Sequence, residues 1–161
     1  MSVPLPITVR NAVPADLIGI LEVQAESGRS TSTRFTEDIT AAIDDENSIL
    51  VVAESGGRVV GWAKTQFFPE PAGPAPAGHY LMGVTVAPVH RRQGVASALL
   101  SARMRWIQQR ESVVFYFTNA RNHASIALHR RAGFLECGRG PLFRGVPFEA
   151  GEGILFSATL S

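Results

Sequence analysis

One stretch decides the fold of this chain: VTVAPVHRRQGVASALL, which runs from Val84 to Leu100. An apolar strand ends at Pro88, a basic turn with Gly94 follows, and apolar residues then recur at helical spacing. The first N–H groups of a helix have no partner inside it and lie at the positive end of its dipole. This order of elements predicts an anion site, where Arg91 and Arg92 add charge-assisted hydrogen bonds to phosphate.

Two well-known phosphate loops are excluded by the spacing of the residues around Gly94. A Walker A loop needs Gly, four residues and then Gly-Lys-Ser/Thr, and a dinucleotide fingerprint needs three spaced glycines with an acidic residue about 20 positions on. Neither pattern occurs in the sequence. On the turn alone, an anion site and an ordinary strand–helix turn with solvated arginines are both open interpretations.

Beyond this stretch, the order of strands and helices follows from periodicity and from turn residues. Tyr80–Val86 is apolar at nearly every position, which predicts a strand covered on both faces, with Gly83 permitting a bulge. Gly56-Gly57 predicts a hairpin turn. Thr36, followed by two acidic residues, is expected to open a helix that runs through Ile43. Pro69–Gly78 is expected to be a loop that borders a substrate site.

The composition narrows the class of protein. Of 161 residues, 45% are hydrophobic and 18% charged, which suits one domain, residues 1–161, with its own core. A net charge of +1 argues against nucleic acid and anionic membrane as partners. Cys137 cannot form an intramolecular disulfide and is expected to be a buried structural thiol. With no leader and no apolar run of about 18 residues, a cytoplasmic protein is expected.

A second segment makes the interpretation of the first segment more specific. NHASIALHRRAGF, from Asn122 to Phe134, has the pattern of a helix that Gly133 ends in a left-handed cap. Together the two segments resemble the GCN5-related N-acetyltransferase (GNAT) family. The family's loop has Gln/Arg, two residues, Gly, one residue and Gly/Ala, and its second segment has Asn, then Ala/Ser three on, an aromatic seven on, and Gly-Phe. The residues that agree are Arg91, Gly94, Ala96, Asn122, Ser125, Gly133 and Phe134.

The resemblance implies a fold and a co-substrate. The fold is α/β (α+β), with a mixed, mostly antiparallel sheet of six to seven strands, a splayed parallel pair at strands 4 and 5, and about four flanking helices. The co-substrate is acetyl-CoA or coenzyme A, with no metal. The backbone near the strand-4 bulge would hold the pantetheine arm, and the loop amides would hold the pyrophosphate. The implied cofactor-binding residues are Val84, Thr85, Val86, Arg91, Arg92, Gln93, Gly94, Val95, Ala96, Ser97, Asn122, Ser125 and His129.

The catalytic groups are less defined. His129 stands where the family often carries Tyr as the acid that protonates the leaving thiolate. An imidazole can donate that proton, but His129 is equally interpreted as a packing histidine, and a thiolate can leave without an acid. His79 and Tyr80, at the start of strand 4, are the candidates for the general base. Glu22, Glu26 and Asp38 in the first helices are further candidates, or else solvated helix charges. His90 and His123 have no cluster of ligands around them, so no metal site is expected.

The resemblance leaves the acceptor open. A small-molecule or peptide amine is expected, and the segment Phe143–Gly153 would fold over its side of the site, where Glu149 and Glu152 either recognise a cation or are solvated. A homodimer is common in the family. The leading hypothesis is an acetyl-CoA-dependent N-acetyltransferase in which the amine attacks directly in a ternary complex. The alternative is a non-catalytic module of the same fold that binds or senses acyl-CoA.

Overall fold

The chain forms two compact units in a computed structural model that describes residues 5–148 and 151–161. The first unit consists of Met1–Thr65 and Met82–Arg105, and the second of Gln66–Leu81 and Trp106–Ser161. The chain passes from one unit to the other inside regular elements rather than through linkers. The single domain expected over residues 1–161 stays a prediction.

The regular elements follow the predicted order. Their bounds are β1 (Thr8–Asn11), η1 (Pro14–Asp16), α1 (Leu17–Glu26), α2 (Thr33–Asp44), β2 (Leu50–Ser55), β3 (Arg58–Phe68), β4 (Gly78–Val86), η2 (Pro88–His90), α3 (Val95–Gln108), β5 (Val113–Asn119), α4 (His123–Arg131), β6 (Leu135–Gly140), β7 (Leu142–Phe143), β8 (Val146–Pro147) and β9 (Gly153–Thr159). The described strands form a seven-stranded sheet in the order β1-β2-β3-β4-β5-β9-β6 and a separate β7-β8 pair. The only parallel pairing among those recorded joins β4 to β5. The predicted fold class is therefore confirmed.

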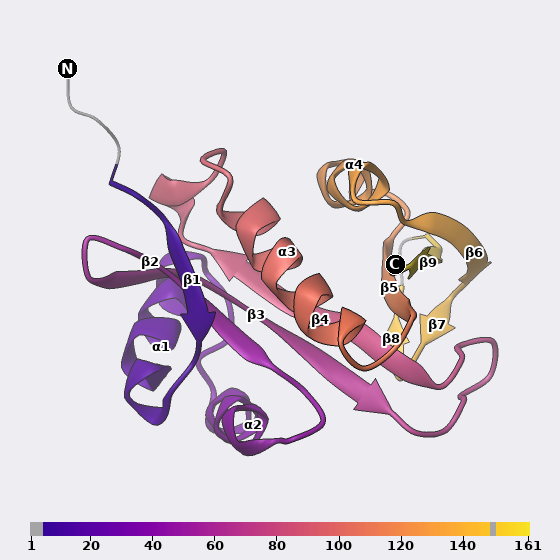
Figure 1. Ribbon diagram of the computed structural model, residues 1–161, viewed down its shortest axis with the longest axis horizontal. Coiled ribbons are helices and arrows are strands. Elements are labelled where there is room, and N and C mark those ends of the chain that lie inside the picture. Colours follow the sequence, from indigo (N-terminus) through magenta and orange to yellow (C-terminus); the bar gives the residue numbers. More distant parts are fainter. Residues whose placement is uncertain (1–4, 149–150) are drawn as a thin grey trace. The chain divides into compact units, whose positions relative to one another are not determined.

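In the first unit, helices cover both faces of the antiparallel strands β1, β2 and β3. Trp62 of β3 belongs to a core cluster with residues of α1 and α2, among them Ile20 and Ile39. Its neighbour Gly61 faces the opposite side, where an added Cβ would meet Val95 at 3.1 Å and Leu99 at 3.3 Å, both on α3. Successive side chains of a strand point to opposite faces, and Figure 1 shows α1 and α2 on one side of β2 and β3 with α3 on the other.

Two local predictions for the first unit differ from the structure. Helix α2 begins at Thr33 rather than Thr36, because the Ser32 side chain accepts a hydrogen bond from the Phe35 N–H at 3.1 Å and caps the helix earlier. Strand β4 is not covered on both faces along its whole length, because Gly83 and Val84 are exposed. The Gly56-Gly57 turn is confirmed, with φ of 59° and 79°.

In the second unit, β5 lies at the centre of the strand order β4-β5-β9-β6. It pairs with β9 over its full length, and its parallel pairing with β4 joins His79 to Val114 and Tyr80 to Phe115. Residues of β4 from Met82 onward belong to the first unit. The splay expected of this strand pair therefore stays a prediction.

The end of the chain differs from the sequence-based expectation at Cys137. This thiol is exposed, and the prediction of a buried structural thiol is wrong. The reason is its place in β6, which ends the strand order of the sheet and carries a register shift between Glu136 and Gly138. The short β7–β8 hairpin was not predicted either. Among the described helices, none is long and apolar enough to span a membrane.

Candidate functional site

The predicted anion loop lies in the first unit, between η2 and α3. Arg92 and Gly94 both have left-handed backbone, with φ of 62° and 82°. The Ala98 N–H donates to the Gly94 carbonyl at 3.0 Å and makes the first bond of the helix. The amides of Val95 to Ser97 precede that bond and so have no acceptor within α3. Alternating left-handed backbone before a helix N-terminus forms a concave anion site, so the geometry fits the predicted phosphate cradle.

The side chains of this loop are exposed and partly engaged with nearby carbonyls. Arg91 Nε donates to the Val86 carbonyl at 3.2 Å, and Gln93 Nε2 donates to the Val89 carbonyl at 3.3 Å. Val86 is one of the backbone positions predicted to hold pantetheine. In this structure its carbonyl oxygen accepts the hydrogen bond from the Arg91 guanidinium. Arg92 lies exposed next to the loop amides. Arg91 and Arg92 thus place positive charge at the cradle, and this charge is not held in a buried ion pair.

The distortion of β4 at Gly83 has a packing cause within the first unit. Gly83 has φ of 66°, and a Cβ there would lie 3.0 Å from the Trp62 ring. The Trp62 indole N–H in turn donates to Gln24 Oε1 at 2.9 Å, and Gln24 Nε2 donates to the Ser30 carbonyl at 3.0 Å. A glycine is therefore needed at position 83 both for its backbone conformation and for the close approach of Trp62.

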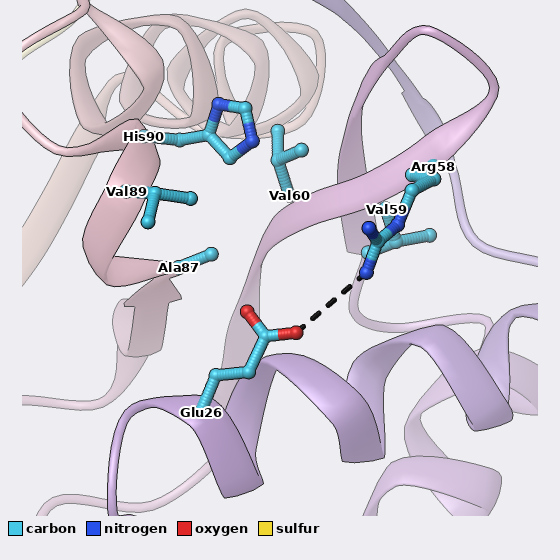
Figure 2. A pocket seen from close by; sticks show the side chains of 7 residues that line it. All are labelled: Glu26, Arg58, Val59, Val60, Ala87, Val89 and His90. Atoms are coloured by element: carbon cyan, nitrogen blue, oxygen red, sulfur yellow. Dashed lines mark ion pairs between the residues drawn. The ribbon is translucent and has the colours of Figure 1, made fainter.

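A pocket of about 220 Å³ opens beside η2 in the first unit. Figure 2 shows Glu26 of α1 and Arg58 of β3 pointing toward one another on one side, with His90 and Val89 on the other. The Glu26–Arg58 ion pair measures 3.7 Å and both side chains are exposed, so it contributes little stability. Ligand sites usually occupy about 300–1,000 Å³. This pocket is therefore smaller than a site for a whole substrate.

In the second unit, His129 lies in an aromatic and polar cluster at the end of α4. Its ring stacks on Tyr116 of β5 with centroids 3.6 Å apart and planes 1° apart, and it is only 4% exposed. The distance from Nδ1 to the Ser125 carbonyl is 2.7 Å. Because a carbonyl oxygen only accepts, Nδ1 carries a proton, and Nε2 of the neutral ring bears the lone pair. The ring can then donate from Nε2 only as an imidazolium.

Tyr116 completes this cluster, although the sequence analysis gave it no catalytic or cofactor-binding role. Its hydroxyl forms a very short contact with Ser125 Oγ. Asn122 caps α4 by accepting from the Ser125 N–H at 3.4 Å, while its Nδ2 donates to Thr118 Oγ1 at 3.1 Å. That Asn122 and Ser125 line the cofactor stays a prediction. Because Val114 and Tyr116 alternate with phenylalanines in β5, the signal that could have identified Tyr116 is its position on the face that α4 covers.

The two candidate bases, His79 and Tyr80, are consecutive in β4, so their side chains point to opposite faces of the strand. His79 is 6% exposed and packs against Phe67 and Trp106, with ring centroids 4.7 and 5.7 Å away. Burial lowers the pKa of its imidazole, with Glu111 opposing that shift. A neutral ring is the form that a base requires, although this ring is enclosed by aromatic side chains.

Tyr80 is fully buried and anchors a neighbouring loop. Its hydroxyl donates to the Pro76 carbonyl at 2.6 Å, and its ring stacks on Phe115 at 5.1 Å. Burial raises the pKa of the phenol, and the nearby Arg144 guanidinium opposes the shift. A phenol that donates to a backbone carbonyl is poorly placed to accept a proton from a substrate. Its assignment as a base stays a prediction with this geometry against it.

Of the acidic residues expected near the acceptor, Glu152 accepts a hydrogen bond from Arg139 at 3.0 Å, and both side chains are exposed. Glu149 lies outside the described residues. In the part of the chain that the structure describes, no group of three His, Cys, Asp or Glu side chains is arranged to hold a metal ion.

Comparisons with known proteins agree with this geometry. The model of the acetyltransferase (GNAT) family matches residues 17–134. Mycothiol acetyltransferase of Arthrobacter sp. (strain FB24) is 33% identical over 112 residues, which are 68% of this chain and 34% of that protein. The chain thus spans about a third of the length of this curated relative.

Solved structures extend the likeness to nearly the whole chain. Ribosomal-protein-alanine N-acetyltransferase from Brucella melitensis is 27% identical with a TM-score of 0.76, covering 95% of this chain and 99% of that one. A GNAT superfamily phosphinothricin acetyltransferase from Sinorhizobium meliloti, in complex with acetyl-CoA, is 23% identical with a TM-score of 0.75, covering 96% of this chain and 89% of that one. Because its identity is only 23%, the comparison with the phosphinothricin acetyltransferase shows a shared fold alone.

Proposed function

The chain belongs to the GNAT acetyltransferase family, and from this premise we propose that it transfers an acetyl group from acetyl-CoA to an amine. The observation that carries the proposal is the cradle at the start of α3, where left-handed backbone at Arg92 and Gly94 precedes amides with no acceptor in the helix. Such a site suits a pyrophosphate, and coenzyme A contains one. The acetyl-CoA bound to the phosphinothricin acetyltransferase is consistent with the same use.

The proposed reaction is direct attack in a ternary complex, with no covalent intermediate on the protein. The amine lone pair forms a bond to the thioester carbonyl carbon, the carbon–sulfur bond breaks, the nitrogen loses a proton and the thiolate gains one. The backbone of Val84 to Val86 is proposed to hold the pantetheine arm, and the amides of Arg92 to Ser97 the pyrophosphate. Cys137 is not required as a nucleophile, so Cys137→Ala should retain activity.

The test of this proposal is release of the coenzyme A thiol in the presence of acetyl-CoA and a panel of acceptors. The panel contains small primary amines, amino acids and a peptide with an N-terminal alanine, the last chosen because of the Brucella melitensis relative. We expect release that depends on both acetyl-CoA and one class of acceptor. Tight binding of acetyl-CoA with no acceptor-dependent release would favour the alternative, a module that binds or senses acyl-CoA.

His129 is proposed as the group that protonates the leaving thiolate. Its Nδ1–H is committed to the Ser125 carbonyl, so the proton would come from Nε2 of the imidazolium, and turnover should fall as that proton is lost. His129→Phe keeps an aromatic ring against Tyr116 but removes both nitrogens. If His129 is the acid, this variant loses roughly 10²- to 10⁴-fold in kcat. Unchanged kcat would remove His129 from the mechanism.

A further inference from the structure

A second pocket, in the second unit, has the size of a ligand site. It lies between residues 72–74 of the Pro-rich loop and the β7–β8 hairpin and has a volume of about 410 Å³. Its walls are mostly apolar, with Phe68, Pro74 and Leu142 among them, and its one charged lining residue is Arg144. Binding clefts for small molecules are mostly apolar, have a few placed polar groups, and usually occupy about 300–1,000 Å³. This pocket meets both conditions.

The backbone at Arg144 is unusual for an arginine. Arg144 and Gly145 form the two-residue turn between Phe143 and Val146, with φ of 51° and 82°. Asn-Gly or Gly-Gly adopts such a turn at lower conformational cost, because a Cβ disfavours left-handed backbone. Strained backbone of this kind is concentrated at binding sites. The arginine side chain therefore occupies this position at some cost to the turn.

The Arg144 guanidinium is held at the pocket but is not neutralised by any described acidic residue. It lies 4.2 Å from the Phe68 ring centroid and 5.2 Å from that of Tyr80, and its Nη2 donates to the Pro76 carbonyl at 2.6 Å. Its Nε is buried and has no acceptor among the described residues. The ion pairs recorded in residues 5–148 and 151–161 involve other arginines. The cation is thus fixed in orientation at the pocket wall, and its charge is not paired with a carboxylate of the described residues.

We infer that this pocket binds the carboxylate of a small molecule with a flat apolar body. A single guanidinium matches a single negative charge, presents planar N–H donors to a planar carboxylate, and leaves the apolar walls for the rest of the ligand. This inference rests on the proposed function in one respect: the bound compound is taken to be the acceptor, an amine that also carries a carboxylate. An acceptor of that class differs from the purely cationic one that Glu149 and Glu152 suggested.

The binding test uses three matched probes without acetyl-CoA: phenylacetate, phenylacetamide and phenethylamine. Isothermal titration or ligand-observed NMR should show phenylacetate binding roughly 10- to 100-fold more tightly than the amide, as expected for hydrogen bonds to a charged group. Arg144→Met should bring that ratio to about 1. Arg131→Met, which removes an exposed arginine of α4, is the matched control and should leave the ratio unchanged.

A second variant keeps the test decisive if Arg144→Met does not fold. Leu142 is 52% exposed on the pocket wall, and Leu142→Trp should narrow the pocket and weaken all three probes while Arg144 stays in place. Equal binding of phenylacetate and phenylacetamide to the unmodified chain would overturn the inference. So would a preference for phenylacetate that survives in Arg144→Met.

The assignment of the ligand as acceptor has its own measurement. With acetyl-CoA present, phenylalanine should be acetylated with a kcat/KM at least about 10-fold above that of phenethylamine, and Arg144→Met should abolish the difference. If phenethylamine is the better acceptor while phenylacetate still binds, the acceptor assignment is wrong. If no amine is acetylated at all, the proposed function fails, and the binding result with phenylacetate is unaffected.

Discussion

Replacing Gly94 by alanine tests two roles of this glycine separately. One is to adopt left-handed backbone, which affects stability, and the other is to let a ligand approach the loop, which affects affinity. Gly94 has φ of 82°, and an added Cβ would meet no atom within 4 Å. The substitution therefore creates no steric clash in the free protein, and its cost comes from the backbone, at about 1–2 kcal/mol. If the loop holds a pyrophosphate, however, the added methyl group occupies open space at the cradle and should hinder the approach of the phosphate.

Gly57 supplies a matched control for this experiment. It lies in the β2–β3 turn with φ of 79°, and a Cβ there also meets nothing within 4 Å. Both variants should lose about 1–2 kcal/mol of unfolding free energy. Only Gly94→Ala should weaken coenzyme A binding, by roughly 10- to 100-fold, which corresponds to losing one hydrogen bond to a charged group.

The measurements are urea denaturation for the free energy of unfolding and calorimetric titration with coenzyme A for the affinity. Denaturation checks that the two variants are equally destabilised, so that a difference in affinity cannot reflect a difference in folding. Equal affinity of both variants for coenzyme A would refute the placement of the pyrophosphate at Gly94. A loss of affinity in Gly57→Ala as large as in Gly94→Ala would refute it as well.

Three further predictions concern the first unit. Trp62→Phe removes the indole N–H and leaves the buried Gln24 side chain without a donor, so urea denaturation should show a loss of about 1–3 kcal/mol. Ser32→Ala removes the cap of α2 and should cost about 1 kcal/mol in the same assay, whereas no change would contradict the cap. Hydrogen bonds from Arg10 hold the pKa of the buried Asp16 below its ordinary value. Because this pKa is lower in the folded state, the stabilisation is complete above about pH 4 and is lost as the pH falls through the lowered value. Stability measured against pH should therefore fall less steeply in acid for Asp16→Asn, and an unchanged profile would contradict the assignment.

Much of the fold could be predicted because its signals are local. The Gly56-Gly57 turn, the cap at Gly133 and the helix that follows Gly94 each depend on residues within a few positions of one another. Where the prediction was wrong, either a competing local signal was passed over or the cause lies in strand neighbours distant in the sequence. Helix α2 begins early because Ser32 caps it, and Cys137 is exposed because β6 has a neighbour on one side only, which no apolar run reveals.

The same distinction between local and distant signals applies to the candidate site. A site made of backbone amides is encoded by a turn and a helix, so the loop around Gly94 could be predicted from one stretch of sequence. A site made of side chains from distant segments could not. Arg144 reaches the carbonyl of Pro76 from 68 positions away, and Tyr116 meets Ser125 and His129 through the packing of a helix on a strand.

This difference affects how the two proposed binding sites can vary. The proposed coenzyme A cradle depends on backbone conformation at Arg92 and Gly94, and the Arg92 side chain is exposed, so few changes preserve the turn while altering what it binds. The pocket at Arg144 depends on one side chain held over Phe68 by a turn that would accept Asn or Gly more readily. Replacing Arg144 by Asn or Gly would relieve strain and remove the charge at once. If this pocket binds the acceptor as proposed, acceptor preference should change through position 144 without any loss of coenzyme A affinity.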